Sequence, residues 1–149
     1  MEITLKRAKA EEVSLLAQMN RELIEDEKHE NPMTLSELSS RMREFLEGAY
    51  VAALILRGQE VIGYLLYRDQ PRVFRPGARD LYLRQFFIKR ELRGQGYGRK
   101  AFEIVRRDWF PPNSVISVEV LSKNPGALAF WRKLGFEDYC LSLRQIKSS

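Results

Sequence analysis

The stretch that decides the fold of this 149-residue chain is Arg93-Gly94-Gln95-Gly96-Tyr97-Gly98-Arg99. It lies between an apolar, strand-like segment at residues 81–88 and a helix-like segment at residues 98–109. Glycines at alternate positions let the backbone turn tightly and point several N–H groups in one direction. Helix N-termini carry orphan N–H donors and partial positive charge, and arginines at both ends of this turn add more. The stretch therefore predicts a diphosphate-binding turn.

Two common glycine-rich phosphate motifs do not match this turn. A dinucleotide-binding turn needs Gly-x-Gly-x-x-Gly, but position 99 is Arg, and no acidic residue ends a following strand at the usual distance. A nucleoside-triphosphate loop needs Gly-Lys followed by Ser or Thr, which is absent. A glycine-rich connection without any ligand stays open as the alternative.

A second segment carries signals at both of its ends: Asn124-Pro125-Gly126-Ala127-Leu128-Ala129-Phe130-Trp131-Arg132-Lys133-Leu134-Gly135-Phe136. Asn124 is a suitable N-cap, Pro125 fits the first helical position, and Gly135 suits the left-handed position after the last turn. Apolar residues recur at helical spacing on one face, namely Ala127, Leu128, Trp131 and Leu134. The segment predicts one short helix.

Together the two segments resemble the GNAT superfamily of acetyl-CoA-dependent N-acetyltransferases. The first fits its Arg/Gln-x-x-Gly-x-Gly/Ala signature through Arg93, Gly96 and Gly98. The second fits an Asn-x-x-Ala-x-x-Phe-Tyr-x-x-x-Gly-Phe type of ending through Asn124, Ala127, Phe130, Gly135 and Phe136. The resemblance implies an α/β (α+β) GNAT fold in one domain, residues 1–149. Its mixed, mostly antiparallel central sheet would have six to seven strands, flanked by about four helices.

Residue patterns predict the elements of this fold along the chain. Strands are expected at residues 3–7, 50–56, 61–67, 80–88 and 115–121, with a last strand, or a strand and hairpin partner, in 136–146. Helices are expected at residues 10–26, 34–47 and 98–109 and within 124–136. Either Thr34 or Ser36 would cap the second helix.

Composition indicates the class of protein and the compartment to expect. Hydrophobic content of 44% and charged content of 30% are typical of a globular protein. No apolar run reaches membrane-span length, and no signal-peptide pattern is present, so a cytoplasmic protein without membrane contact is expected. A single cysteine, Cys140, excludes an internal disulfide, and a single histidine, His29, gives metal binding little support. A homodimer is left open.

The net charge of +5 is concentrated around the predicted phosphate turn, since basic residues dominate from 68 to 107. Such a surface could attract nucleic acid, but aromatic residues are not interleaved with the basic ones as stacking platforms. A polyphosphate cofactor explains the charge, so no nucleic-acid partner is expected.

The resemblance implies acetyl-CoA as cosubstrate and a small-molecule or peptide amine as acceptor. The central strand and the next strand would splay apart, and the pantetheine arm would lie along the central strand. A backbone N–H there would stabilise the oxyanion. The implied cofactor-binding residues are Phe86, Phe87, Ile88, Arg93, Gly94, Gln95, Gly96, Tyr97, Gly98, Arg99, Asn124, Ala127, Phe130 and Trp131. Core packing by Phe86, Phe87 and Ile88, and simple helix capping by Asn124, stand as alternatives.

One departure from the family pattern affects the mechanism. Many GNAT enzymes carry Tyr where this chain has Trp131, and its hydroxyl can protonate the departing thiolate. An indole N–H donates a hydrogen bond but does not titrate usefully. Four other hydroxyls are candidates: Tyr64, Tyr82, Tyr97 and Tyr139. The expected function is that of an N-acetyltransferase working by direct transfer in a ternary complex. Because of this departure, a non-catalytic acetyl-CoA-binding sensor or regulatory domain stays open as the alternative.

Two residues are candidates for catalysis. Some GNAT members carry a Glu general base where this chain has Glu119, although Glu119 could also simply point outward from its strand. Gln85 could orient a water molecule near the same site. Residues 81–87 look like the strand of polyamine-type acetyltransferases, which carry an acidic pair where this chain has Arg84 and Gln85. Polyamines are therefore not favoured. The acidic run at 25–27 either selects a cationic amine or is a solvated helix end.

Overall fold

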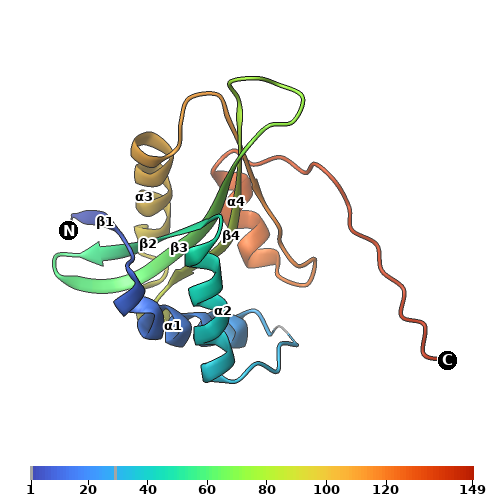
Figure 1. The fold of residues 1–149 in the computed structure, drawn as a ribbon, viewed down its shortest axis with the longest axis horizontal. Coiled ribbons are helices and arrows are strands. Elements are labelled where there is room, and N and C mark those ends of the chain that lie inside the picture. The colour runs from blue at the N-terminus through green and yellow to red at the C-terminus, as the bar shows by residue number, and fades with distance from the viewer. Residues whose placement is uncertain (1, 29) are drawn as a thin grey trace. The chain divides into compact units, whose positions relative to one another are not determined.

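The structure, a computed structural model, describes residues 2–28 and 30–149; His29, the residue considered above for metal binding, lies outside them (Figure 1). Within these residues there are four α-helices and one five-stranded sheet in the order β1-β2-β3-β4-β5. The strands are β1 (Ile3–Arg7), β2 (Tyr50–Arg57), β3 (Glu60–Pro71), β4 (Arg79–Ile88) and β5 (Ser114–Val118). The helices are α1 (Val13–Asp26), α2 (Leu35–Glu47), α3 (Tyr97–Ile104) and α4 (Pro125–Lys133).

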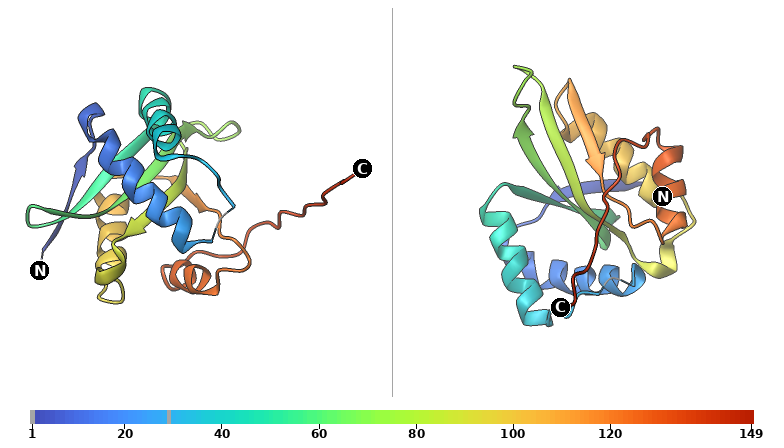
Figure 2. Two further views of the ribbon diagram at one scale, coloured as in Figure 1. Left: turned by 90° about the horizontal axis from the view of Figure 1, so that it is seen from below. Right: turned by 90° about the vertical axis from the view of Figure 1, so that its right-hand side faces the viewer.

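The chain forms two compact units, Met1–Glu119 and Val120–Ser149. In the first unit, β1 to β4 pair as antiparallel neighbours, and β5 pairs with β4 in parallel. Helices α1 and α2 cover one face of the sheet and α3 lies on the other (Figure 2). The mixed α/β architecture and the four helices agree with the GNAT fold expected from the sequence.

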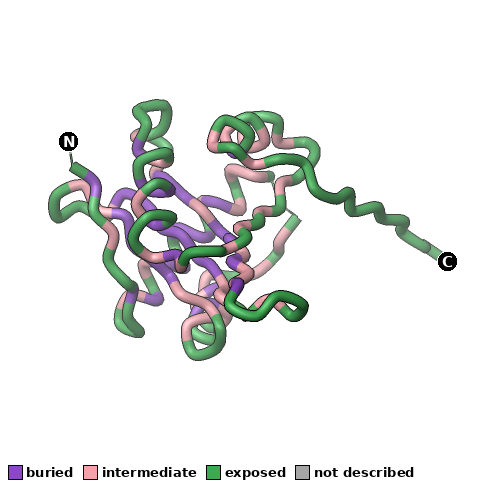
Figure 3. The backbone as a smooth tube through the Cα atoms, turned by 90° about the horizontal axis from the view of Figure 1, so that it is seen from above, coloured by how far each residue is buried: buried purple, intermediate pink, exposed green. Residues whose placement is uncertain are grey.

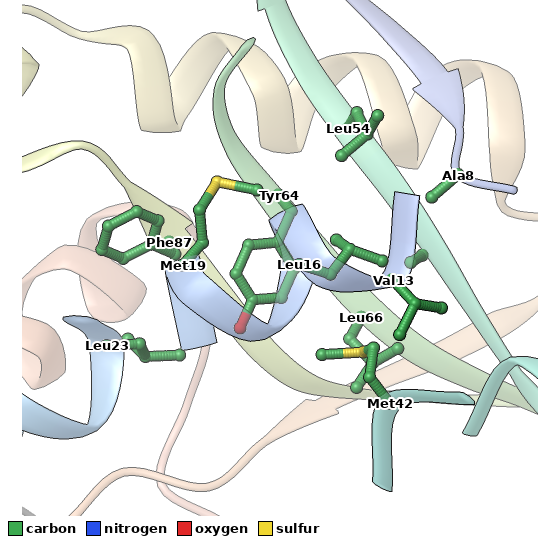
Figure 4. Close-up of a cluster of buried hydrophobic side chains, with 11 residues drawn as sticks. Ala8, Val13, Leu16, Met19, Leu23, Met42, Leu54, Tyr64, Leu66 and Phe87 are labelled. Carbon is green, nitrogen blue, oxygen red and sulfur yellow. The ribbon is translucent and has the colours of Figure 1, made fainter. Parts of the chain in front are cut away.

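The core lies on both faces of the central strands. Because helices cover the sheet on two sides, β2 and β3 contain continuous buried runs at residues 52–55 and 62–67 instead of a simple alternation (Figure 3). One cluster joins α1 and α2 to the sheet through Leu16, Met19, Met42, Leu54, Tyr64, Leu66 and Phe87 (Figure 4). This packing holds β4, the strand on which the candidate site is built.

The expected number of strands was wrong, because the described sheet has five strands and not six to seven. Residues 136–146 were expected to supply the last strand or strands, but the chain from 136 to 149 forms neither helix nor strand. Their alternating apolar side chains are exposed: Tyr139 by 98%, Leu141 by 88% and Leu143 by 89%. Alternation stabilises a strand only where a neighbouring strand offers hydrogen bonds and a face to bury against.

The third helix also differs from the prediction. It is α-helical only to Ile104 and then widens into a π-helical turn, η3 (Val105–Trp109). The Phe110 N–H donates to the Val105 carbonyl at 2.9 Å, and the Phe110 ring packs edge-on against Tyr67 at 4.9 Å. The predicted strand at residues 115–121 is β5 and ends earlier, at Val118.

The predicted caps are confirmed. Thr34, not Ser36, caps α2: its Oγ1 accepts from the Glu37 N–H at 3.1 Å, and the Glu37 carboxylate accepts from the Thr34 N–H at 2.9 Å. Asn124 caps α4 through the Ala127 N–H at 3.2 Å, and Gly135 has a left-handed φ of +95°.

Two kinds of feature are absent from the described residues. None of the helices in residues 2–28 and 30–149 has the length and apolar character needed to cross a membrane. In the same residues no group of three or more His, Cys, Asp or Glu side chains is arranged to hold a metal ion.

Candidate functional site

The candidate site lies at the carboxyl end of β4. Its pairing with β5 runs from Arg79 opposite Ser114 to Leu83 opposite Val118. β4 continues to Ile88, still paired with β3, whereas β5 has ended. The side of residues 84–88 that faces away from β3 therefore lies outside the β4–β5 ladder, as the expected divergence of these strands requires.

A β-bulge in β4 sets the directions of two side chains near this point. Leu66 of β3 lies opposite Gln85 and Tyr67 lies opposite Leu83, so Arg84 is the extra residue. Gln85 is buried, and its side-chain oxygen accepts a 2.8 Å hydrogen bond from the Tyr64 hydroxyl. Arg84 is exposed.

Tyr64 is fully buried, and this burial raises the pKa of its hydroxyl well above the ordinary value. The group therefore stays protonated and serves as a donor to Gln85. A fixed amide could orient a water molecule, which is the role predicted for Gln85.

The proposed base, Glu119, lies immediately after β5 and is exposed. Its carboxylate accepts a 2.5 Å hydrogen bond from the Tyr82 hydroxyl of β4. Burial, followed by the hydrogen bond and charge of Glu119, raises the pKa of Tyr82 to about 12. Tyr82 therefore keeps its proton at neutral pH and orients the carboxylate. Sequence analysis named both residues but not their contact, which joins positions 37 apart.

The other hydroxyls considered above lie elsewhere. The Tyr64 hydroxyl donates its hydrogen bond to Gln85, and the Tyr97 hydroxyl accepts from Arg57 at 3.3 Å. Tyr139 is 98% exposed in the second unit. Of the four, Tyr82 is the one hydrogen-bonded to the proposed base.

The glycine-rich turn has the geometry that its sequence predicts. Gly94 has φ of +77° and Gly96 has φ of +84°, in the left-handed region that favours glycine. Gly96 is the N-cap of α3, so the N–H groups of Tyr97, Gly98 and Arg99 belong to the first helical turn. Donors at this position point along the helix axis, where an anionic group is favoured.

The arginines at the two ends of this turn are already engaged. Arg93 donates through Nε to the Ile88 carbonyl at 2.8 Å and through Nη2 to the Asp26 carboxylate. Arg99 forms an exposed pair with Glu103 at 3.1 Å. Both guanidinium groups thus have carboxylate partners of their own, and the backbone N–H groups of the first helical turn are further donors in this region.

Asp26, part of the acidic run at 25–27, was not expected to contact the glycine-rich turn and is not a solvated helix end. It accepts from Arg90 at 2.6 and 3.0 Å as well as from Arg93, and its side chain is only 16% exposed. Burial acts to raise the pKa of Asp26, but the hydrogen bonds and charges of Arg93 and Arg90 outweigh it, so the pKa lies below its usual value. No local sequence signal marks a contact between positions 67 apart.

The three apolar residues at the end of β4 contribute to the core. Phe87 and Ile88 are buried and Phe86 is half-buried, and the Phe87 ring lies 6.1 Å from that of Tyr64. Side-chain packing and backbone contact with a ligand are compatible, except that the Ile88 carbonyl already accepts from Arg93.

The remaining predicted cofactor residues belong to the second unit. Asn124 and Ala127 form the cap of α4. The Trp131 ring packs edge-on against Phe130 at 4.9 Å and Phe136 at 5.1 Å. Trp131 thus stabilises the end of this helix within its own unit.

A surface hollow of about 430 Å³ lies away from this region. Residues of the β3–β4 loop and of β5 line it, including Arg72, Phe74 and Val115. This is the opposite end of β4 from Ile88, so the hollow is not part of the candidate site.

Comparison with known proteins agrees with this arrangement. A family model described as the acetyltransferase (GNAT) family matches residues 16–136. A thialysine N-epsilon-acetyltransferase from Bos taurus is 27% identical over 146 residues, covering 91% of this chain and 85% of the relative.

Solved structures share the fold. A possible acetyltransferase from Clostridium difficile 630 superposes with a TM-score of 0.82 at 15% identity, covering 100% of this chain and 99% of that one. An aminoglycoside N-acetyltransferase in complex with CoA superposes with a TM-score of 0.75 at 11% identity, covering 99% of this chain and 96% of that one. With the family model spanning most of the sequence, the chain belongs to the GNAT family and is an acetyltransferase.

Proposed function

We propose that the protein transfers an acetyl group from acetyl-CoA to a primary amine by direct attack in a ternary complex. One observation carries the proposal. Strand β4 extends beyond the end of β5, and its carboxyl end leads to the N-terminus of α3. The pantetheine arm would lie along residues 86–88, and the pyrophosphate would meet the backbone N–H groups of Tyr97, Gly98 and Arg99. The CoA complex of the aminoglycoside acetyltransferase with the same fold supports this choice of cosubstrate.

The acceptor chemistry is supported by relatives that act on amines. The bovine relative is named for the N-epsilon position of thialysine, and the structural relative for aminoglycosides. Both names denote transfer to nitrogen, so an amine is the acceptor proposed for this chain. Proximity in a ternary complex can lower the barrier by about 7–11 kcal/mol in favourable cases.

The chain's own residues account for the proton taken from the amine. The amine nitrogen forms a bond to the thioester carbonyl carbon, and the proton that it loses passes to the Glu119 carboxylate, directly or through a water oriented by Gln85. A backbone N–H of residues 86–88 stabilises the oxyanion. The C–S bond then breaks, and its electron pair leaves with the thiolate, a fair leaving group because thiols have a pKa of about 8.5.

The location of the cofactor is tested by a matched pair of glycine variants. Gly96→Ala and Gly77→Ala both place an alanine at a φ near +84° or +83°, and neither added Cβ meets any atom within 4 Å. Each variant should therefore lose about 1–2 kcal/mol through backbone strain alone. Only Gly96→Ala should weaken acetyl-CoA binding in calorimetry. Equal affinity in both variants would contradict a phosphate site at the turn.

The reaction is tested by following CoA thiol release over amino acids, diamines, aminoglycosides and peptide N-termini. Glu119→Gln should lower kcat for the best acceptor, and Glu11→Gln, an exposed carboxylate on another element, should not. Acetyl-CoA at a hundredfold excess over its Kd should stabilise the protein by about 2.7 kcal/mol. Stabilisation without thiol release on any amine would instead indicate a non-catalytic acetyl-CoA-binding domain.

A further inference from the structure

Three arginines gather on the sheet face covered by α1 and α2. Arg41 of α2 lies over the Phe45 ring at 5.4 Å, and Arg84 of β4 lies over the same ring at 4.9 Å. Arg68 of β3 lies over Tyr50 at 5.8 Å. The Phe45 and Tyr50 rings are themselves 4.7 Å apart, so one aromatic pair supports all three guanidinium groups. These residues, Arg41, Arg68 and Arg84, are called the arginine cluster below.

The charges of the arginine cluster are not balanced by carboxylates. Within residues 2–28 and 30–149 the side-chain hydrogen bonds of the cluster go to neutral groups: Arg41 donates to the Asn20 amide oxygen at 3.0 Å, and Arg84 to the Tyr50 hydroxyl at 3.4 Å. The ion pairs among the described residues involve other basic side chains, such as Arg79 with Asp69 at 2.8 Å.

Arg41 shows most clearly that the cluster has a guanidinium donor without an acceptor among the described residues. Its Nε is buried and has no hydrogen-bond partner among the described residues. Burial, and next the charge of Arg84, lowers the pKa of Arg41. A buried donor without an acceptor and two neighbouring like charges both destabilise a fold. A bound anion would relieve both costs, because guanidinium groups bind carboxylates through paired, charge-assisted hydrogen bonds.

The cluster lies beside the groups proposed for catalysis. Arg84 directly precedes Gln85 at the β4 bulge, and the residues proposed to meet the thioester oxygen, 86–88, follow on the same strand. Arg68 lies 5.4 Å from the Tyr82 ring, and Tyr82 is hydrogen-bonded to Glu119. A positively charged region and a carboxylate therefore border the same part of the sheet.

We propose that the arginine cluster binds a carboxylate of the acceptor, so that the acceptor is a small amine that also carries a carboxylate, as an amino acid does. The assignment rests on the proposed N-acetyltransferase function. It gives the two ends of the acceptor separate partners, the carboxylate at Arg84 and Arg41 and the amine toward Glu119. Polycations would be repelled by the same arginines.

The first test compares acceptors that share an amine and differ in their anionic group. CoA thiol release is measured with amino acids and with the corresponding amino-acid amides, and lysine is also compared with 1,5-diaminopentane. The best amino acid should exceed its amide by at least tenfold in kcat/KM. Phosphoethanolamine, spermidine and an aminoglycoside complete the panel. Preference for the phosphate compound, or equal use of amides and diamines, would overturn the carboxylate assignment while leaving N-acetylation intact.

The second test uses Arg84, because Arg41 also bonds to α1 and its variants could fail to fold. Arg84→Gln should raise KM for the amino acid at least tenfold, with little change in KM for acetyl-CoA or in melting temperature. Arg75→Gln, at an exposed arginine of the β3–β4 loop, is the matched control and should behave as the parent. An unchanged acceptor KM in Arg84→Gln would refute the cluster as the binding site. Absence of thiol release from every acceptor would instead overturn the proposed function, and this inference with it.

Discussion

Replacing Asp26 by Asn tests how the phosphate turn is held in place. The Asp26 carboxylate accepts hydrogen bonds from Arg90 and from Arg93, and Arg93 also donates to the Ile88 carbonyl at the end of β4. Asn keeps the size of the side chain but removes its charge and one acceptor oxygen. The variant therefore weakens the link between the end of α1 and the strand-to-turn junction without leaving a cavity.

The expected loss of stability follows from how far the side chains of this ion pair are exposed to solvent. The Asp26 side chain is 16% exposed, whereas those of Arg90 and Arg93 are 58% and 39% exposed. Breaking a fully buried pair costs about 3–5 kcal/mol and losing an exposed one about 0–1 kcal/mol. A loss of about 1–2 kcal/mol is expected for Asp26→Asn. For a domain of this size that corresponds to a fall in melting temperature of about 3–8 °C.

Calorimetry with a matched control makes this test specific. Asp138→Asn is that control, since Asp138 also accepts a forked guanidinium, from Arg132, but its side chain is 72% exposed. It should leave the melting temperature unchanged within error. If both variants lose the same amount, burial of Asp26 is not the source of the effect.

The contribution of Asp26 to stability should change with pH in a defined direction. Because the folded-state pKa of Asp26 is lowered below 3.8, its contribution is complete above that pH and is lost as pH falls through the folded-state value. The stability difference between parent and Asp26→Asn should therefore be constant near neutrality and shrink below about pH 4. A difference that grows on acidification would contradict the lowered pKa.

Acetyl-CoA affinity separates two roles for Arg93. If Arg93 holds the turn, Asp26→Asn should weaken acetyl-CoA binding or leave it unchanged. Tighter binding would mean that release from Asp26 lets Arg93 reach the phosphates, and it would refute the assignment of phosphate binding to the backbone.

Three further predictions concern other parts of the chain. Thr34→Ala should cost about 1 kcal/mol in thermal unfolding through loss of the cap of α2, whereas Ser36→Ala should be nearly neutral. Gly63→Ala should cost about 1–3 kcal/mol, because the added Cβ would lie 2.0 Å from a β4 carbonyl oxygen; unchanged unfolding would show that the strands can move apart freely. Tyr82→Phe should lower kcat several-fold with little change in KM for acetyl-CoA, because the hydrogen bond from Tyr82 orients the Glu119 carboxylate; an unchanged kcat would argue against Glu119 as the base.

Local signals in the sequence predicted local structure well. The caps at Thr34 and Asn124 and the left-handed backbone at Gly96 depend on groups within a few residues of each other. Such contacts are visible as short motifs, because one turn of chain contains both partners. The glycine-rich turn of the opening stretch therefore has the conformation that its sequence predicts.

Alternation of apolar residues was a weaker guide. It predicted the strands β1 to β5 but also a strand within residues 136–146, which the described structure lacks. Alternation records which side chains could share a face, whereas a strand forms only beside a partner.

The sequence by itself determined the family, the order of elements as far as α4 and the conformation of the glycine-rich turn, because each depends on residues near one another in the chain. Only the tertiary structure decided that Arg93 bonds to Asp26 and that Tyr82 holds Glu119. It also decided that Arg84 joins an arginine cluster with no carboxylate partner among the described residues. These contacts join α1, α2 and the sheet, and they depend on strand register and on one bulge in β4. A shift of a single residue in that register would turn these side chains to the opposite face of the sheet.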